Sequence, residues 1–92
     1  MSELIQRTVT IRNKLGLHAR AATKLAKLSH QFDAKVYIVQ NEQKVDASSV
    51  MCLLLLASGQ GRDIDIVAEG HDAAAAVDAI ANLIESRFDE DQ

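Results

Sequence analysis

Residues 13–20 read Asn-Lys-Leu-Gly-Leu-His-Ala-Arg, and this short stretch separates two different hydrophobic periods. Before it, between residues 5 and 11, apolar and polar residues alternate, which is the period of a half-buried strand. After it, between residues 21 and 32, apolar residues recur at intervals of four and three, which is typical of one face of a helix. Because Gly16 readily adopts a positive φ, the sequence predicts a strand, a glycine turn and a helix that begins near His18.

The remaining elements follow from the same patterns further along the chain. We expect strands at 35–40, 44–46 and about 63–69, a short helix from Ser48 or Ser49 to Ala57, and a last helix capped by Asp72. The order βαββαβα predicts an α+β fold in which helices cover one face of an antiparallel sheet. The 92 residues have room for one domain, residues 1–92. The pattern leaves the strand order open, and a ferredoxin-like arrangement is the commonest one.

Composition excludes several classes of function. The formal net charge of -3 argues against general nucleic-acid binding, which needs clustered Lys and Arg, and the single cysteine fits a reducing compartment. Residues 1–6 contain no signal-peptide pattern, and the apolar run Val50 to Ala57 is far shorter than the ~20 residues of a membrane span. The three histidines lack metal-ligand spacing, and no cofactor loop is visible. We expect a cytoplasmic protein without metal or cofactor that binds neither nucleic acid nor membranes.

The start of the predicted first helix combines three features that favour phosphate chemistry. A helix N-terminus offers unpaired backbone N–H groups and the positive end of the dipole. The Arg20 guanidinium can hold phosphate oxygens in a fork. A neutral imidazole, here His18, is a good nucleophile toward phosphorus. On residue types alone, a histidine that only caps the helix and an arginine that is only solvated remain the simpler interpretations.

The run from Lys14 to Arg20 resembles the active-site signature of the HPr family of bacterial phosphotransferase systems. A second block, Val45 to Gly61, and the run Ala68-Glu69-Gly70 before an alanine-rich helix resemble the family's other regions, so the resemblance covers essentially the whole chain. It implies an HPr-like open-faced β-sandwich, with four antiparallel strands in the order 1-4-2-3 and three helices on one face.

The resemblance also implies a function, which is that of a carrier and not an enzyme. His18 would accept a phosphoryl group on Nδ1 from Enzyme I, which phosphoenolpyruvate charges, and would pass it to an Enzyme IIA-type protein. Arg20 would neutralise the phosphate, and the backbone N–H groups of Ala19 and Arg20 would bind it. Ala21 departs from the proline that many members have, which loosens the start of the helix without removing a donor.

The second helix is apolar nearly all the way round, which predicts both core and docking residues. Leu53 and Leu56 are assigned to the core. By resemblance, the docking residues for both partners are Thr23, Lys24, Lys27, Val50, Met51 and Leu54. Ser49 is interpreted first as a helix cap. Some HPr proteins are phosphorylated at this position, so a serine kinase and phosphorylase are possible further partners, although Cys52 stands where a glycine is common.

The segment Asn13 to His18 and the ending Arg87 to Asp91 resemble the nitrogen-related carriers (NPr) more than the sugar-transport branch. We therefore expect a phosphorelay protein of nitrogen regulation, and a monomer. The alternatives are a sugar-transport HPr and a non-carrier ferredoxin-like binding module. An RNA-binding module of that kind would need stacking aromatics on a basic sheet face, and the strands offer only Tyr37. A hydrolase based on His18 would need a second catalytic group, which the sequence does not place nearby.

Overall fold

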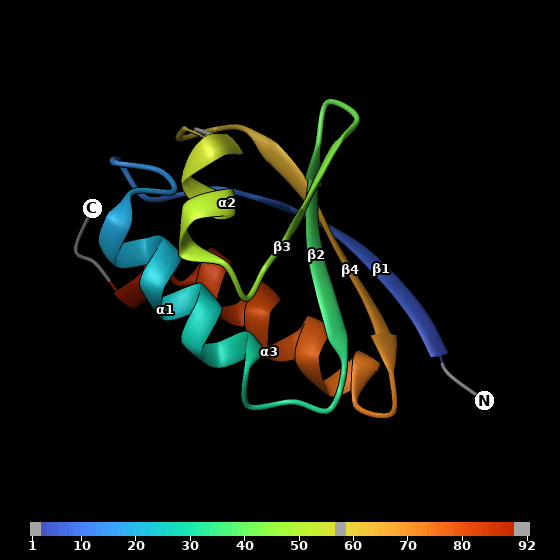
Figure 1. Cartoon of the computed structure of the whole chain (residues 1–92). Coiled ribbons are helices and arrows are strands. Elements are labelled where there is room, and N and C mark those ends of the chain that lie inside the picture. Colours follow the sequence, from blue (N-terminus) through green and yellow to red (C-terminus); the bar gives the residue numbers. More distant parts are fainter. Residues whose placement is uncertain (1–2, 57–58, 90–92) are drawn as a thin grey trace.

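The computed structural model describes residues 3–56 and 59–89 (Figure 1). Its elements are β1 (Glu3–Thr10), α1 (Ala19–Ser29), β2 (Lys35–Gln40), β3 (Gln43–Asp46), α2 (Val50–Leu56), β4 (Asp63–Gly70), α3 (Ala73–Glu85) and the 3-10 turn η1 (Arg87–Asp89). The order βαββαβα is as predicted. Ala57, the expected end of the second helix, lies outside the described residues.

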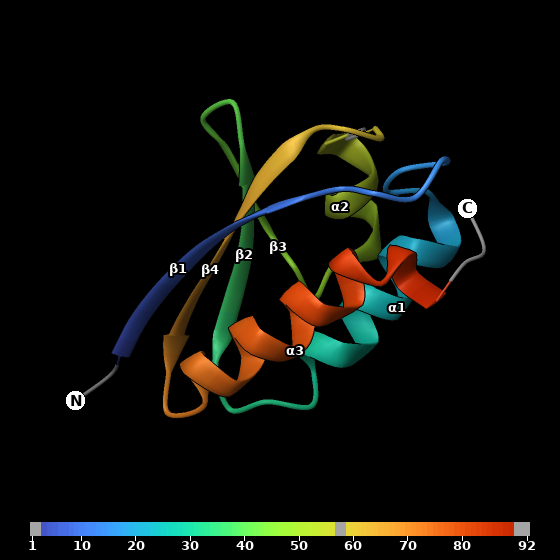
Figure 2. The same cartoon turned by 180° about the vertical axis from the view of Figure 1, so that it is seen from behind.

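The four strands form one antiparallel sheet in the order β1-β4-β2-β3, which confirms the order implied by the family resemblance. The pairing of β1 with β4 runs from Glu3↔Gly70 to Thr10↔Asp63, so these two strands are paired over their full lengths. The three helices lie on one face of the sheet, and the other face is open (Figures 1 and 2). The predicted α+β architecture is therefore confirmed.

Strand alternation and helix periodicity bring their apolar residues into one core. The inner face of the sheet contributes Val9, Val36, Ile38, Ile64 and Ile66, and the helices add Leu25, Leu53, Ile80 and Ile84. The core is aliphatic apart from Phe88, whose side chain is fully buried. Leu53 and Leu56 are buried, as predicted.

Two local predictions need correction. The hairpin turn is shorter than expected, because β3 begins at Gln43 and only Asn41 and Glu42 connect the strands. Both residues have positive φ, 49° and 70°. A two-residue turn with positive φ at both positions matches the twist of the flanking strands, and it usually contains glycine, which is absent here. Asp72 stands at the N-cap of α3 but forms no side-chain cap, because its carboxylate accepts a hydrogen bond from the Asp33 N–H at 2.8 Å.

Backbone pairing continues beyond the end of β1 and fixes the position of the following turn. The Ile11 N–H donates to the Arg62 carbonyl at 2.9 Å, and the Gly61 N–H donates to the Ile11 carbonyl at 2.8 Å. The Gln60 side-chain amide donates to the Arg12 carbonyl at 3.1 Å. The loop before β4 therefore holds residues 11 and 12 in place. These two residues lie directly before the turn that begins at Asn13.

None of the helices within residues 3–56 and 59–89 has the length and apolar character needed to cross a membrane.

Candidate functional site

A tight turn delivers His18 to the start of α1. The Gly16 N–H donates to the Asn13 carbonyl at 3.1 Å, and Gly16 has the positive φ of 65° that its sequence context predicts. Leu17 is buried next to the N-cap and anchors the chain in the core. Leu17 lies directly before the N-cap, and Ala22 is the fourth residue of the helix; both are buried. Apolar residues at these two positions often pack together and stabilise the start of a helix. His18 is thus placed from both sides, by the turn and by the helix.

His18 is the N-cap residue of α1, with φ -89° and ψ -178°. Its Nδ1 accepts a hydrogen bond from the Arg20 backbone N–H at 3.3 Å. A ring nitrogen that accepts a hydrogen bond presents its lone pair there, so the proton of the neutral imidazole is on Nε2. The nucleophilic lone pair of Nδ1 therefore faces the positive end of the helix.

The first turn of α1 combines exposed side chains with backbone donors. Ala19 and Arg20 are exposed, and their amides belong to the group at a helix start that has no partner within the helix. The Thr23 hydroxyl donates to the Ala19 carbonyl at 2.7 Å and stabilises this turn. Because no acidic residue lies in the first turn, the site is suited to an anion.

The basic side chains of α1, Arg20, Lys24 and Lys27, are only partly available to a partner. Arg20 and Lys27 are exposed. Lys24 is half-buried, and its Nζ donates to the Phe88 carbonyl at 2.6 Å. Lys24 therefore fixes the 3-10 turn η1 against α1. Sequence patterns do not predict this contact, because the two residues are 64 positions apart.

Helix α2 packs beside α1 (Figure 1). It exposes several apolar side chains. Met51 is 75% exposed and Leu54 40% exposed, as expected of docking residues, and Val50 is half-buried. Leu55, at 73% exposure, was missed, although its position four residues after Met51 places it on the same helix face. Leu15 in the turn before His18 is also exposed and apolar and was not anticipated.

Ser49 is the residue that caps α2. Its Oγ accepts a hydrogen bond from the Cys52 N–H at 3.2 Å, which settles the choice between Ser48 and Ser49. The Ser48 hydroxyl and N–H instead donate to the Asp46 carboxylate at 2.6 and 2.8 Å. These two hydrogen bonds, with a smaller contribution from His30, hold the pKa of Asp46 below its usual value despite some burial.

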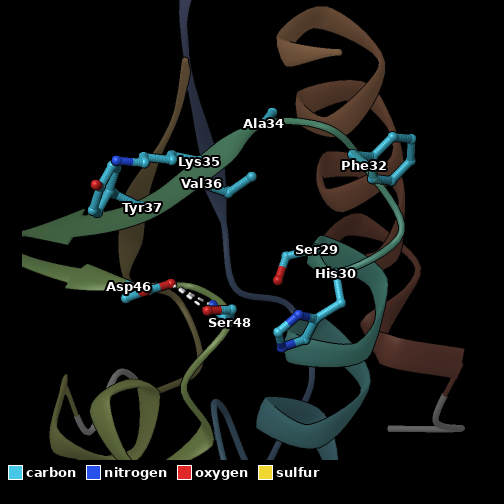
Figure 3. A pocket seen from close by; sticks show the side chains of 9 residues that line it. All are labelled: Ser29, His30, Phe32, Ala34, Lys35, Val36, Tyr37, Asp46 and Ser48. Carbon is cyan, nitrogen blue, oxygen red and sulfur yellow. Dashed lines mark hydrogen bonds between the residues drawn. The ribbon is translucent and has the colours of Figure 1, made fainter. Parts of the chain in front are cut away.

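A pocket of about 320 Å³ lies at the other end of α1 (Figure 3). The His30 ring points toward Ser48 across it, and Asp46 and Tyr37 line its far side. His30 is the C-cap residue of α1, whereas His18 is the N-cap, so the pocket contains none of the predicted phosphate-binding residues. Over the described part of the chain, no group of three or more His, Cys, Asp or Glu side chains is arranged to hold a metal ion.

Comparison with known proteins agrees with this geometry. The chain is 56% identical over 86 residues to phosphocarrier protein NPr of Shewanella violacea, covering 94% of each chain. It is 44% identical over 87 residues to phosphocarrier protein HPr of Cupriavidus necator, covering 95% of this chain and 98% of the relative. The crystal structure of an HPr from Thermoanaerobacter tengcongensis matches with a TM-score of 0.91 at 35% identity, covering 96% of this chain and 99% of that one.

The family model described as the PTS HPr component phosphorylation site matches residues 5–86 and thus includes the His18 turn and all of α1, α2 and α3. Members of this family are carriers that are transiently phosphorylated on histidine. Together with the strand order and the histidine at the N-terminus of α1, this match establishes that the chain belongs to the HPr family of phosphocarriers of the phosphotransferase system.

Proposed function

We propose that this phosphocarrier accepts a phosphoryl group on Nδ1 of His18 from an Enzyme I-type donor and passes it to an Enzyme IIA-type acceptor, in the nitrogen-related branch. One observation carries the assignment to His18: its Nδ1 lone pair faces the amides at the N-terminus of α1. The relative that is 56% identical is named NPr, which supports the nitrogen-related branch.

The transfer step follows from this geometry. The Nδ1 lone pair attacks the phosphorus, and the bond from phosphorus to the donor breaks with its electron pair returning to the donor. The Arg20 N–H then loses Nδ1 as its acceptor and donates to a phosphoryl oxygen instead, so no hydrogen bond is lost. Nε2 keeps its proton throughout. Because the helix amides are fixed before the reaction, they meet the developing charge without rearrangement.

Mixing the chain with an Enzyme I-type donor, Mg²⁺ and phosphoenolpyruvate, and measuring intact mass, tests the proposal. We expect a gain of one acid-labile phosphoryl group that tandem mass spectrometry locates on His18. A faster gain with nitrogen-branch than with sugar-branch Enzyme I supports the branch assignment, and the reverse contradicts it. No gain with either donor contradicts the carrier function.

Arg20→Ala is expected to slow phosphoryl transfer by about 10²–10³-fold, because it removes a charged donor from the transition state. Arg20→Lys keeps the charge but not the fork, so its rate is expected to lie between the two. Single-turnover rates with a charged donor measure the effect. Lys44→Ala, which removes one positive charge on β3, is the matched control and is expected to keep the native rate. Equal losses of rate in Arg20→Ala and Lys44→Ala would show that the effect of Arg20 is one of net charge alone, which would contradict its role at the phosphoryl group.

Docking on α2 predicts a different kinetic signature. Met51→Asp is expected to raise KM for donor and acceptor at least about tenfold with little change in kcat, because the residue is exposed and contributes to association and not to chemistry. Leu4→Asp is the matched control, since Leu4 is 68% exposed but lies at the far end of β1. A similar KM for both variants would show that α2 is not the docking surface.

The finer partner assignments are part of the same proposal. Arg20 and Lys27 are exposed and suit acidic partner surfaces. We assign docking also to Thr23 and Lys24 on α1 and to Val50 and Leu54 on α2. Ser49 is half-buried and engaged as a cap, which favours the structural role over modification by a serine kinase. We place the protein in the cytoplasm, as a monomer and as one domain, the last supported by its single sheet and core.

A further inference from the structure

Asn13 is a polar side chain in a position that belongs to the core. It is fully buried, with 0% of its surface exposed, and it is among the larger side chains in this class. Burying an amide is unfavourable unless it forms hydrogen bonds. Asn13 Nδ2 donates to the Gly16 carbonyl at 2.7 Å, so its burial is tied to the conformation of the turn before His18.

The Gly16 carbonyl connects Asn13 to His18. It accepts the Asn13 side-chain amide at 2.7 Å and also the His18 backbone N–H at 3.0 Å. The Gly16 N–H donates in return to the Asn13 carbonyl at 3.1 Å. The Asn13 side chain therefore helps to orient the peptide group that contains the Gly16 carbonyl. That carbonyl in turn holds the backbone N–H of His18.

We infer that Asn13 is a positioning residue for phosphoryl transfer, which rests on the proposed role of His18. By holding the Gly16 carbonyl, Asn13 keeps His18 at the N-cap, where Nδ1 faces the Arg20 amide. It does not touch the phosphoryl group or a partner protein, because it is buried. Loss of its N–H donor leaves the Gly16 peptide held by fewer bonds and lets the imidazole drift from the line of attack.

The kinetic consequence differs from that of a docking residue. A misplacement of ~1 Å in a reacting group can slow a reaction by ~100-fold. We therefore expect Asn13→Leu to lower kcat for phosphorylation by about 10- to 100-fold, with KM for the Enzyme I-type donor unchanged. Leucine has the same branching at Cγ and the same number of side-chain heavy atoms as asparagine and suits a buried site. The Gly16 carbonyl also keeps its bond from His18, so the fold is expected to be retained.

Two further variants make the test specific to positioning. Asn13→Asp keeps the shape but removes the N–H donor and is expected to lose rate as well. Val36→Ala makes a defect in the core of β2, away from the turn, and is expected to keep the native kcat below its melting temperature. The ¹⁵N chemical shift of His18 Nδ1 supplies a readout besides rate: it is expected to change in both Asn13 variants and to stay native in Val36→Ala.

The outcomes separate this inference from the proposed function. A native kcat and a native Nδ1 shift in folded Asn13→Leu would overturn the role of Asn13 while the role of His18 stands. A raised KM at unchanged kcat, or equal rate losses in Asn13→Leu and Val36→Ala, would also overturn it. If His18→Ala still accepts phosphate at the native rate, the proposed function itself fails.

Discussion

His18→Ala is expected to take up no phosphoryl group from a charged Enzyme I-type donor, which is the largest functional effect that the structure predicts. The variant lacks Nδ1, the atom that accepts the Arg20 amide at the start of α1. It also lacks the side-chain cap, which is worth about 1 kcal/mol of stability. His18→Asn separates the two roles, because asparagine is a strong N-cap but has no nucleophilic ring nitrogen. We expect native stability and no uptake.

The chain offers two matched controls for this experiment. His30 is the C-cap residue of the same helix, and His71 lies in the turn before α3; both are exposed. Alanine at either position is expected to leave uptake, measured by intact mass, at the native level. Native uptake in His18→Asn would remove His18 from the site. Loss of uptake in His30→Ala would point instead to the pocket beside Asp46 and Ser48.

Periodicity predicted most of the fold because each element buries one clear face. The change of period around Gly16 located the end of β1 and the start of α1 within one or two residues. Periodicity could not predict the strand order, because an alternating strand can pair with any other strand of the sheet. The order followed only from the family resemblance. The hairpin was misjudged by one residue because Asn41 and Glu42 adopt left-handed conformations that favour glycine.

The sequence predicts a chemical role for the candidate site, but it does not predict which residues hold the histidine in place. The position of His18 before Arg20 at a helix start is a local feature, and local features can be recognised in sequence. The burial of Asn13 is not visible in its local sequence. The chain just before it is held by residues far away in the sequence, because Gly61 and Arg62 pair with Ile11. A polar residue before a glycine turn is therefore interpreted as a solvated turn residue until the structure places it.

Phe88→Ala is expected to destabilise the protein by about 3–5 kcal/mol, the usual cost of removing a buried phenylalanine. The ring is fully buried although it lies after the last helix, in the 3-10 turn η1. Arg87 and Phe88 both have positive φ, 62° and 54°, and this pair of left-handed residues turns the chain back toward α1. Such conformations are unfavourable for bulky residues, so the burial of the ring must more than offset their cost.

The expected loss is a large part of the whole stability, since domains of this size have only about 5–15 kcal/mol. By the same scale, the melting temperature is expected to fall by about 12–40 °C. Urea and thermal unfolding followed by circular dichroism measure both quantities. Phe88→Leu is the matched control, because it retains most of the apolar volume and is expected to lose much less stability.

The Phe88 anchor also connects stability to the site, because the Phe88 carbonyl holds Lys24 of α1 at 2.6 Å. If η1 detaches in Phe88→Ala, Lys24 is released while the start of α1 keeps its own supports in Asn13, Gly16 and Leu17. We therefore expect Phe88→Ala to be phosphorylated at a near-native rate at temperatures well below its midpoint. A loss of stability below about 1 kcal/mol would contradict the structural role of the ring, given the usual cost of such a cavity. A collapse of the phosphorylation rate in the still-folded variant would instead show that η1 supports the active histidine through α1.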